Sequence, residues 1–403
     1  MTGLFHQPEW CPNCQWGLER FDGERHGVVG WKWLDRRLYA LAFRMTNSEF
    51  ARQQAGAPPG AATGTRIAVT AVAVALHLTV LACLVVGVWL CVHDFPSRTL
   101  IAGIPLVLVA ILLRPRFWRL PSNVTVLRRR DAPALHDLVH RVAAAVGAPV
   151  PHVVGVDGDY NAYATSVGIR RRRVLVVGLP LWGTLGPQER VALLGHELGH
   201  FVNGDVRRGL FTQPVYRTLP TVRLLLTPSH GAGGGGIAAW IGTAIFRVIA
   251  AGLRAVVFAA ELALRWLAER DGQRAEYDAD ALAARTGGSA AAVSMLDGLA
   301  MGEEILLSVE RAARRGDPVV AWQPAAAKLL AEAATTMPSR RQLTARTEVS
   351  LLASHPPSGF RARLLEGRAP VPPAVVLDPD ASAAIDTELA THYERCSGRM
   401  ANR

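Results

Sequence analysis

Residues 194–205 read LGHELGHFVNGD, with His196 and His200 four positions apart and Glu197 directly after the first histidine. On a helix, positions i and i+4 lie on the same face, about one turn apart. Both imidazoles can therefore point at one ion, and Zn²⁺ accepts imidazole nitrogen at ~2.0–2.1 Å. Glu197 lies ~100° further round the helix, where it can meet a water on the open side of the metal, as a general base must. The stretch predicts a catalytic zinc site.

A catalytic zinc ion needs a third protein ligand, which leaves its fourth position for water. The sequence QRAEYDADALAART, residues 273–286, places Glu276 and Asp280 four positions apart on another predicted helix. One carboxylate can bind the metal while the other orients a ligand histidine, and Asp205 is a second candidate for the orienting position. A solvated helix face is the alternative for each of them. The residues alone leave the third ligand open.

The elements around these residues predict an α+β fold that is mostly helical. Residues 133–147 have helical apolar spacing, and the valine-rich residues 151–181 predict two or three strands around a turn-like DGD. Gly186 and Pro187 open the histidine helix, whose apolar side chains lie on one face. Residues 271–365 are again helical in composition.

Two apolar segments near the N-terminus predict a membrane location. Half of the residues are apolar and the mean hydropathy is +0.18. The unbroken apolar stretch from Ile67 to Val92 is long enough to cross a ~30 Å hydrocarbon core, and the shorter Thr99–Leu113, bracketed by arginines, predicts a second span. Lys and Arg are dense before the first stretch and after the second, but nearly absent between them. By the positive-inside rule the two spans form a hairpin with both flanks in the cytoplasm.

The charge of the chain points to lipid rather than nucleic acid. A net charge of +11 and a pI of about 10.2 suit either an anionic membrane surface or nucleic acid. No basic stretch is interleaved with base-stacking aromatics, so we expect a lipid bilayer as partner and no nucleic acid. Residues 237–267 form a further helical pattern that is apolar except for Arg247, Arg254 and Glu261 on one face. This pattern predicts either a helix between a membrane and a wet groove or an amphipathic helix of the soluble domain.

The five cysteines form no disulfide framework, and the first sixty residues lack the apolar region of a cleavable signal peptide. Cys11 and Cys14 in EWCPNCQWG have the spacing of half a zinc site. His6 and His26, or a second chain, would have to complete this possible second metal site. Two ordinary reduced cysteines in a turn are the alternative.

Four motifs follow the apolar hairpin in order: NAYATS, LGPQERVALLGHELGHFVNGD, RAEYDAD and SHPP. This set, over residues 66 to about 366, resembles the HtpX-like family of membrane-embedded zinc endopeptidases, which is related to the CaaX prenyl proteases. The resemblance implies a zincin-like catalytic domain with a small β-sheet, in addition to the N-terminal transmembrane hairpin. The chain departs from the family at residues 210–228, which are too polar for a clear further span.

The resemblance also implies roles for residues of this chain. His196, His200 and Glu276 would bind one catalytic zinc ion, Glu197 would be the base, and Asp280 would lie in the outer shell.

On the substrate side, the resemblance implies that Asn161, Ala162, Tyr163 and Ala164 form an edge strand along the substrate cleft. His355 would lie near the site and contact the oxyanion.

We therefore expect a zinc endopeptidase of the inner cell membrane, multi-pass, with its catalytic domain in the cytoplasm. Its substrates would be unfolded or membrane proteins, as in membrane-protein quality control. The alternatives are a processing protease of narrow specificity, for prenylated proteins or a regulator, and a non-catalytic membrane zinc scaffold or sensor. The intact Glu197 argues against the last, because a structural site has four protein ligands and no use for a base.

The predicted organisation has four parts. They are a cytoplasmic N-terminal region with the C-x-x-C motif (1–65), a transmembrane hairpin (66–114), a zinc endopeptidase domain that includes the apolar helix 237–267 (115–368), and a Pro-rich linker with a C-terminal tail (369–403).

Overall fold

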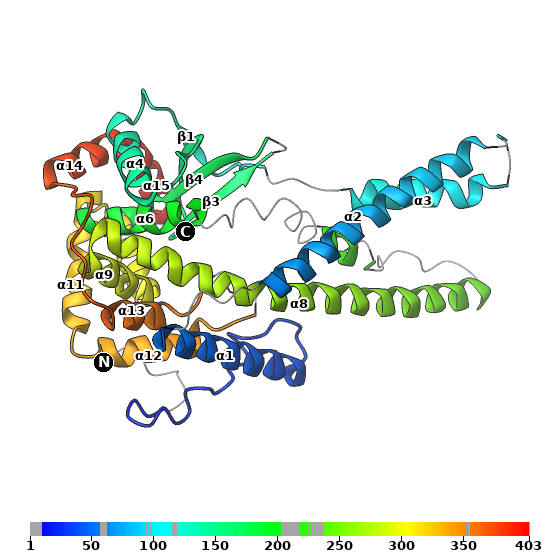
Figure 1. The fold of residues 1–403 in the computed structure, drawn as a ribbon, viewed down its shortest axis with the longest axis horizontal. Coiled ribbons are helices and arrows are strands. Elements are labelled where there is room, and N and C mark those ends of the chain that lie inside the picture. The colour runs from blue at the N-terminus through cyan, green and yellow to red at the C-terminus, as the bar shows by residue number, and fades with distance from the viewer. Residues whose placement is uncertain are drawn as a thin grey trace. The chain divides into compact units, whose positions relative to one another are not determined.

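The chain folds into two compact units (Figure 1). The computed structural model describes residues 10–56, 63–93, 95–96, 98–114, 119–168, 170–202, 218–224, 226–227, 237–351, 353 and 355–402. The larger unit is drawn from residues 1–60, 119–207 and 272–403, and the smaller unit from residues 61–118 and 208–271.

The larger unit combines a small mixed sheet with many helices, which confirms the mostly helical α+β class. Its strands are β1 (Thr125–Leu127), β2 (Val153–Asp157), β3 (Ala162–Val167) and β4 (Arg172–Gly178). Its helices are α1 (Lys32–Gln54), α4 (Pro133–Val146), α5 (Leu179–Trp182), α6 (Pro187–Val202), α9 (Ser289–Ala300), α10 (Gly302–Arg315), η1 (Val319–Ala321), α11 (Trp322–Ala333), α12 (Met337–Thr347), α13 (Ser358–Glu366), α14 (Pro379–Glu388) and α15 (Ala390–Ala401). The smaller unit holds α2 (Thr63–Val92), α3 (Leu100–Leu113) and a helical stretch at 218–224. Helix α8 (Ile237–Gly287) begins in the smaller unit and ends in the larger one.

The sheet has the strand order β1-β2-β4-β3, with β2 and β4 parallel and the two outer pairs antiparallel. Residues 174–177 of β4 are fully buried. A strand covered on both faces needs apolar side chains in both directions, which explains the continuous run VLVV in place of an alternating pattern. Strand β3 lies at one edge, and its first residue, Ala162, pairs with Val177. The expected strands are present, and β1 is a further strand that the sequence did not predict.

The core of the larger unit joins the sheet to α4, α6 and α9. One fully buried leucine from each of these elements illustrates the cluster: Leu138, Leu175, Leu194 and Leu296. Burial of such a side chain contributes ~1.5–3 kcal/mol. Helices α14 and α15 add Ile385, Tyr393 and Cys396 to the same cluster. The C-terminal helices therefore pack into this core, while the domain boundaries proposed from the sequence stay predictions.

The start of α6 is fixed by its own sequence. Pro187 occupies the first turn, where its missing N–H is not needed. The Gly186 amide donates a hydrogen bond to Oε2 of Glu189 at 2.7 Å, which is one half of a capping box. Ser294 of α9 donates its hydroxyl hydrogen to the other oxygen of that carboxylate at 2.5 Å. The histidine helix thus begins at a defined residue and is joined to α9.

The helix predicted over residues 237–267 continues without a break to Gly287. It therefore also carries Glu276 and Asp280, which the sequence placed on a separate helix. The single Gly272 between the two patterns costs only ~1 kcal/mol relative to alanine, and a long helix tolerates that loss.

Within the larger unit, the N-terminal segment, residues 10–56, packs through α1 on other helices. Phe50 stacks on Phe360 of α13, with ring centroids 4.4 Å apart. The side-chain amide of Gln273 in α8 donates a hydrogen bond to the Thr46 hydroxyl at 2.9 Å. The segment therefore contacts both α8 and α13.

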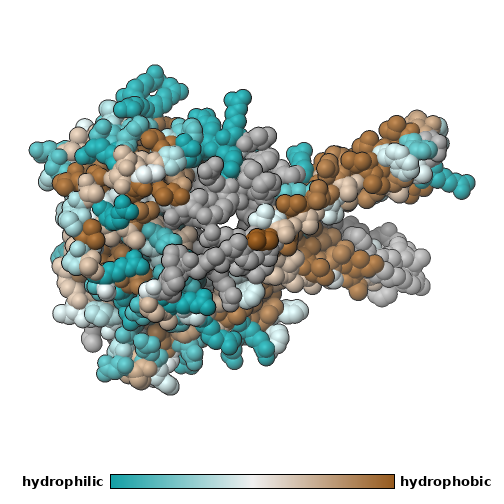
Figure 2. Space-filling view, viewed as in Figure 1, coloured by the Kyte–Doolittle hydropathy of each residue, from teal (hydrophilic) through white to brown (hydrophobic). Residues whose placement is uncertain are grey.

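In the smaller unit, α2 and α3 pack closely against each other. A Cβ added at Gly103 would lie 2.7 Å from the Cys91 sulfur. The visible face of this pair is mostly apolar (Figure 2), and Trp89 and Ile101 are 57% and 79% exposed. Among the described residues, one helical segment, Val69–Val92, is long and apolar enough to cross a membrane, and α3 with its 14 residues is shorter.

We expect Phe50→Ala to lower the free energy of unfolding of the larger unit by about 3–5 kcal/mol, because it removes a buried ring that stacks on Phe360. Thermal unfolding of the purified protein measures the effect. Trp33→Ala on the same helix is the control, since Trp33 is 65% exposed and should contribute at most about 1 kcal/mol. Equal losses in the two variants would contradict the packing of α1 on α13.

Candidate active site

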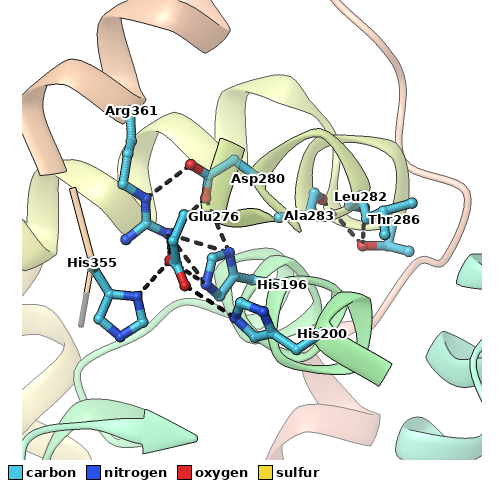
Figure 3. Close-up of polar contacts among 9 residues, drawn as sticks. All are labelled: His196, His200, Glu276, Asp280, Leu282, Ala283, Thr286, His355 and Arg361. Atoms are coloured by element: carbon cyan, nitrogen blue, oxygen red, sulfur yellow. Dashed lines mark hydrogen bonds and ion pairs between the residues drawn. The ribbon is translucent and has the colours of Figure 1, made fainter. Parts of the chain in front are cut away.

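Helix α6 presents His196 and His200 on one face, at successive turns. Their ring centroids lie 4.9 Å apart and the ring planes are nearly perpendicular, at 88°. Only 3% of the His196 side chain and 13% of the His200 side chain are exposed. Both rings point toward α8 rather than to solvent (Figure 3).

Helix α8 brings Glu276 opposite the two histidines. Its Oε2 lies 3.4 Å from Nε2 of His196, and its Oε1 lies 3.5 Å from Nε2 of His200. Ligand atoms that surround a zinc ion tetrahedrally at ~2.1 Å lie about 3.4 Å from one another. Burial by itself would raise the pKa of Glu276, but His355 and His196 outweigh it and hold that pKa well below its usual range. The carboxylate is therefore ionised, as a metal ligand must be.

Two glycines of α6 allow α8 to approach this closely. A Cβ at Gly195 would lie 1.9 Å from Oγ1 of Thr286, and one at Gly199 would lie 3.0 Å from Leu282 and 3.3 Å from the Ala279 Cα atom. The backbones of the two helices are therefore almost in contact. Each glycine directly precedes a histidine, so the turns that allow the close crossing are also the turns that carry the rings.

Asp280, one turn after Glu276 on α8, contacts His196 from the other side. Its Oδ1 lies 3.0 Å from Nδ1 of His196. Arg361 of α13 donates two hydrogen bonds to this carboxylate, from Nε at 2.8 Å and from Nη2 at 2.6 Å. Burial would raise the pKa of Asp280, but Arg361 and His196 outweigh it and lower that pKa to about 2. Asp280 is therefore a charged acceptor at the position from which a carboxylate orients a ligand histidine.

The cluster favours a bound cation. Burial and Arg361 lower the pKa of His196, but hydrogen bonds with Asp280 and Glu276 outweigh both and raise that pKa to about 10. The imidazole must lose this proton when it binds a metal through the nitrogen that carries it, so metal binding and proton release are coupled. Two imidazoles and one carboxylate are donors that zinc accepts, and each histidine lies at the spacing of a neighbouring ligand from the carboxylate.

His355 reaches Glu276 from the stretch between α12 and α13. Its Nδ1 lies 2.5 Å from Oε2 of Glu276, and 37% of its side chain is exposed. Among the described residues, His196, Glu276 and His355 form the one group of three metal-binding side chains whose ligand atoms all lie within 4.8 Å of one another. His355 is therefore an alternative to His200 as a donor to the same ion.

A cavity of about 370 Å³ opens beside the cluster. Asn161 and Ala162 line it from the start of β3, His196 and Glu197 line it from α6, and His355 lines it as well. Glu197 is only 4% exposed. Its carboxylate can therefore act on a group that enters the cavity while it stays shielded from bulk water.

The structure brings most of the residues singled out from the sequence into one place. The members of this cluster and of the cavity lining are Asn161, Ala162, His196, Glu197, His200, Glu276, Asp280 and His355. Tyr163 and Ala164 continue β3 and do not line the cavity. Asp205 lies outside the described residues. Cys11 and Cys14 belong to the N-terminal segment and form no part of this cluster.

Two ionisable residues at the site were not singled out from the sequence, the buried Arg361 and the partly buried Glu348. Glu348 accepts hydrogen bonds from the amide and the hydroxyl of Ser358 at 2.6 and 2.8 Å, which fixes the start of α13 beside His355. Burial raises the pKa of Glu348. In the sequence, both residues are visible only as a glutamate before and an arginine after the SHPP motif. Charged residues are more often solvated than buried, so the sequence offered no reason to place them at the site.

The chain is similar in sequence to known peptidases. The sequence model of peptidase family M48 matches residues 129–369. Protease HtpX of Xylella fastidiosa is 28% identical over 199 residues, which are 46% of this chain and 66% of that protein. Protease HtpX homologues of Bordetella pertussis (30% over 183 residues, 42% and 58%) and Methanocaldococcus jannaschii (26% over 132 residues, 32% and 46%) are similar as well. The chain thus spans about half to two thirds of the length of these curated relatives.

We expect Gly195→Ala to abolish metal binding, because the added methyl group meets Oγ1 of Thr286 and forces α6 away from α8. Zinc content after dialysis and proteolytic activity measure the loss. Gly298→Ala is the matched control, since a Cβ there has no atom within 4 Å. Full zinc occupancy in the Gly195 variant would contradict the idea that the close crossing forms the site.

Replacement of Arg361 by methionine should lower the free energy of unfolding by about 3–5 kcal/mol, because it leaves the buried charge of Asp280 without its partner. Zinc affinity should fall by about 10–100-fold, because Asp280, which orients the His196 ring, loses the guanidinium that holds it in place. Arg340→Met, which removes a more exposed pair with Glu304, should cost at most about 1 kcal/mol and leave zinc affinity unchanged. Chemical denaturation and chelator competition measure the two quantities, and similar values for both variants would contradict this role of Arg361.

Proposed function

We propose that this chain, which belongs to peptidase family M48 and is an HtpX-like protease, uses a zinc ion to hydrolyse peptide bonds and does so at a membrane. One observation carries the proposal. Each of the two α6 imidazoles places a nitrogen 3.4–3.5 Å from an oxygen of the α8 carboxylate, the spacing of neighbouring ligands of one zinc ion, beside a cavity that Glu197 lines. Three protein ligands with an open side are typical of catalytic zinc, which weighs against a non-catalytic scaffold or sensor.

Glu197 is the general base of the proposed reaction. When bound by His196, His200 and Glu276, zinc would lower the pKa of water to about 7 and polarise the peptide carbonyl. Glu197 accepts a proton from the attacking water and delivers it to the leaving amine. Its burial beside the cavity supports this role, because a shielded carboxylate exchanges protons with the substrate rather than with solvent.

Two further groups support the transition state. His355 is partly exposed at the cavity and donates a hydrogen bond to the oxyanion as it forms. Asp280 and Arg361 hold the His196 ring in one orientation during the reaction.

The edge strand β3 is the proposed substrate-binding element. It pairs with β4 on one side, and no other described strand pairs with it. An extended polypeptide can therefore add as a further strand along Asn161, Ala162, Tyr163 and Ala164 and pass the cavity at Glu197. Recognition through the backbone tolerates many side chains, which favours unfolded and damaged membrane proteins over one dedicated substrate.

The apolar helices support a membrane location for the enzyme. Segment Val69–Val92 is long enough to cross a bilayer, and α3 packs on α2 and exposes apolar side chains. We infer a transmembrane hairpin in the inner cell membrane, with the catalytic domain in the cytoplasm because Lys and Arg flank the hairpin on both sides.

Glu197→Gln should reduce hydrolysis of an unfolded substrate such as casein by at least ~10²-fold while zinc stays bound, because the amide cannot accept the proton. Activity and zinc content of the purified protein in detergent are measured together. Glu332→Gln, a change of the same kind at a mostly exposed carboxylate, should leave both unchanged.

Undiminished hydrolysis by the Glu197 variant would contradict the mechanism. A zinc-loaded wild type that ignores casein but cuts one defined peptide would favour the alternative of a narrow-specificity processing protease.

Reporter fusions that end at residue 50 and at residue 130 should both report a cytoplasmic location, because these positions flank the apolar hairpin on its two Arg-rich sides. An external location of residue 130 would contradict the hairpin and the placement of the active site.

A further inference from the structure

The sequence EWCPNCQWG forms a tight turn around its two cysteines. The Cys11 amide donates a hydrogen bond to the carbonyl oxygen of Trp16 at 2.9 Å, and the Gln15 amide donates one to the carbonyl oxygen of Cys11 at 2.8 Å. Gln15, directly after Cys14, has a φ of 59°, a left-handed conformation that residues other than glycine rarely adopt. The surrounding hydrogen-bonded turn holds Gln15 in this conformation.

Both thiols are free and reach the surface, Cys14 more than Cys11. The amides of Cys14 and Asn13 donate hydrogen bonds to the Cys11 sulfur. The thiolate is the form that binds a metal, and the C-x-x-C spacing supplies two of the four ligands of a structural zinc site.

The described part of the chain supplies no third ligand to this pair. Among the described residues, the one group of three metal-binding side chains that lie close together is the cluster around Glu276. The ring of His26 is engaged at both nitrogens, since Nδ1 accepts a hydrogen bond from the Asp22 amide at 3.0 Å and Nε2 donates to the carbonyl oxygen of Arg346 at 2.8 Å. Ligation by His26 would break a buried hydrogen bond. A complete site therefore needs ligands beyond the described residues of one chain.

We propose that Cys11 and Cys14 bind a zinc ion together with the same two cysteines of a second copy of this chain. An isologous contact brings identical surfaces together around a two-fold axis, so one pair from each copy completes four thiolate ligands. This site is separate from the catalytic cluster and does not depend on the proteolytic function.

The surface beside the cysteines suits a second copy. A groove of about 650 Å³ combines aromatic walls with charges of both signs, and its lining is Trp16, Gly17, Glu19, Arg20, Ala40, Phe43 and Arg44. Trp16 is 65% exposed, and tryptophan is enriched where interfaces become buried. Four thiolates around Zn²⁺ carry a net charge of about −2, and the groove that Trp16 lines carries Arg20 and Arg44, whose positive charges favour such an anion.

The cysteine turn is firmly attached to the larger unit. The Arg346 guanidinium donates hydrogen bonds to the carbonyl oxygens of Gly17 and Leu18. Leu18 lies in the same apolar cluster as Phe50 and Phe360. A metal-bridged contact at the cysteines therefore joins two larger units rather than two loose chain ends.

Cobalt substitution of the full-length protein, in detergent and under reducing conditions, tests the proposal. Thiolate-bound Co²⁺ has an intense near-ultraviolet charge-transfer absorption that imidazole and carboxylate ligands do not produce, so it distinguishes this site from the catalytic cluster. We expect this absorption in the wild type, about half a thiolate-bound cobalt per chain, and a dimer by light scattering. Cys14→Ser should lose the absorption and become monomeric, whereas Cys83→Ser, which removes a thiol from α2, should keep both.

His196→Ala should keep the charge-transfer absorption and the dimer, because it changes only the catalytic cluster. Absence of the absorption in the wild type would overturn the metal site. The absorption in a monomer with one thiolate-bound cobalt per chain would overturn the second copy as the source of the other ligands.

Discussion

The candidate site depends on how closely α6 and α8 cross. Gly195 and Gly199 leave no side chain between the two backbones, so the histidines that follow them lie within 3.4–3.5 Å of the Glu276 carboxylate. Ligands on two packed helices are held more accurately than ligands on loops, and a metal site requires that accuracy. The sequence GHELGH therefore serves two purposes at once, because its glycines set the distance between the helices and its histidines use that distance.

Buried charge is the second constraint. Asp280 and Arg361 are 1% and 3% exposed, and an ion pair in such a place gains little net stability unless its hydrogen bonds are complete. Here the guanidinium satisfies both carboxylate oxygens, and the carboxylate orients His196. Arg361 directly follows Phe360, on which the N-terminal segment packs through Phe50. The metal cluster is thus joined through α13 to a segment that lies outside the family match.

Local patterns in the sequence were sufficient to predict a mostly helical fold, a small sheet and two histidines on one helix face. Each of these features depends on residues that are close in the chain. The third ligand depends on a contact between α6 and α8 that no local pattern encodes, so Glu276 and Asp280 stayed equivalent until a family resemblance separated them. Their places in the structure differ, since Glu276 faces both histidines whereas Asp280 contacts only His196. Arg361 was missed because its burial depends on long-range packing of α13. The unbroken helix through Gly272 was missed because a glycine between two patterns usually indicates a boundary.

The central claim is that the crossing of α6 and α8 forms the zinc site. Comparing the zinc affinities of His200→Ala and His355→Ala tests it most directly, because both residues lie near Glu276 but only His200 belongs to the crossing. Competition with a chromophoric chelator measures both affinities, and a Cys14→Ser background limits the count to the catalytic ion. If the crossing forms the site, His200→Ala loses a ligand and its affinity falls by more than ~100-fold, while His355→Ala stays within the 10–100-fold range of an outer-shell change. Full affinity in His200→Ala together with loss of zinc in His355→Ala would contradict the account.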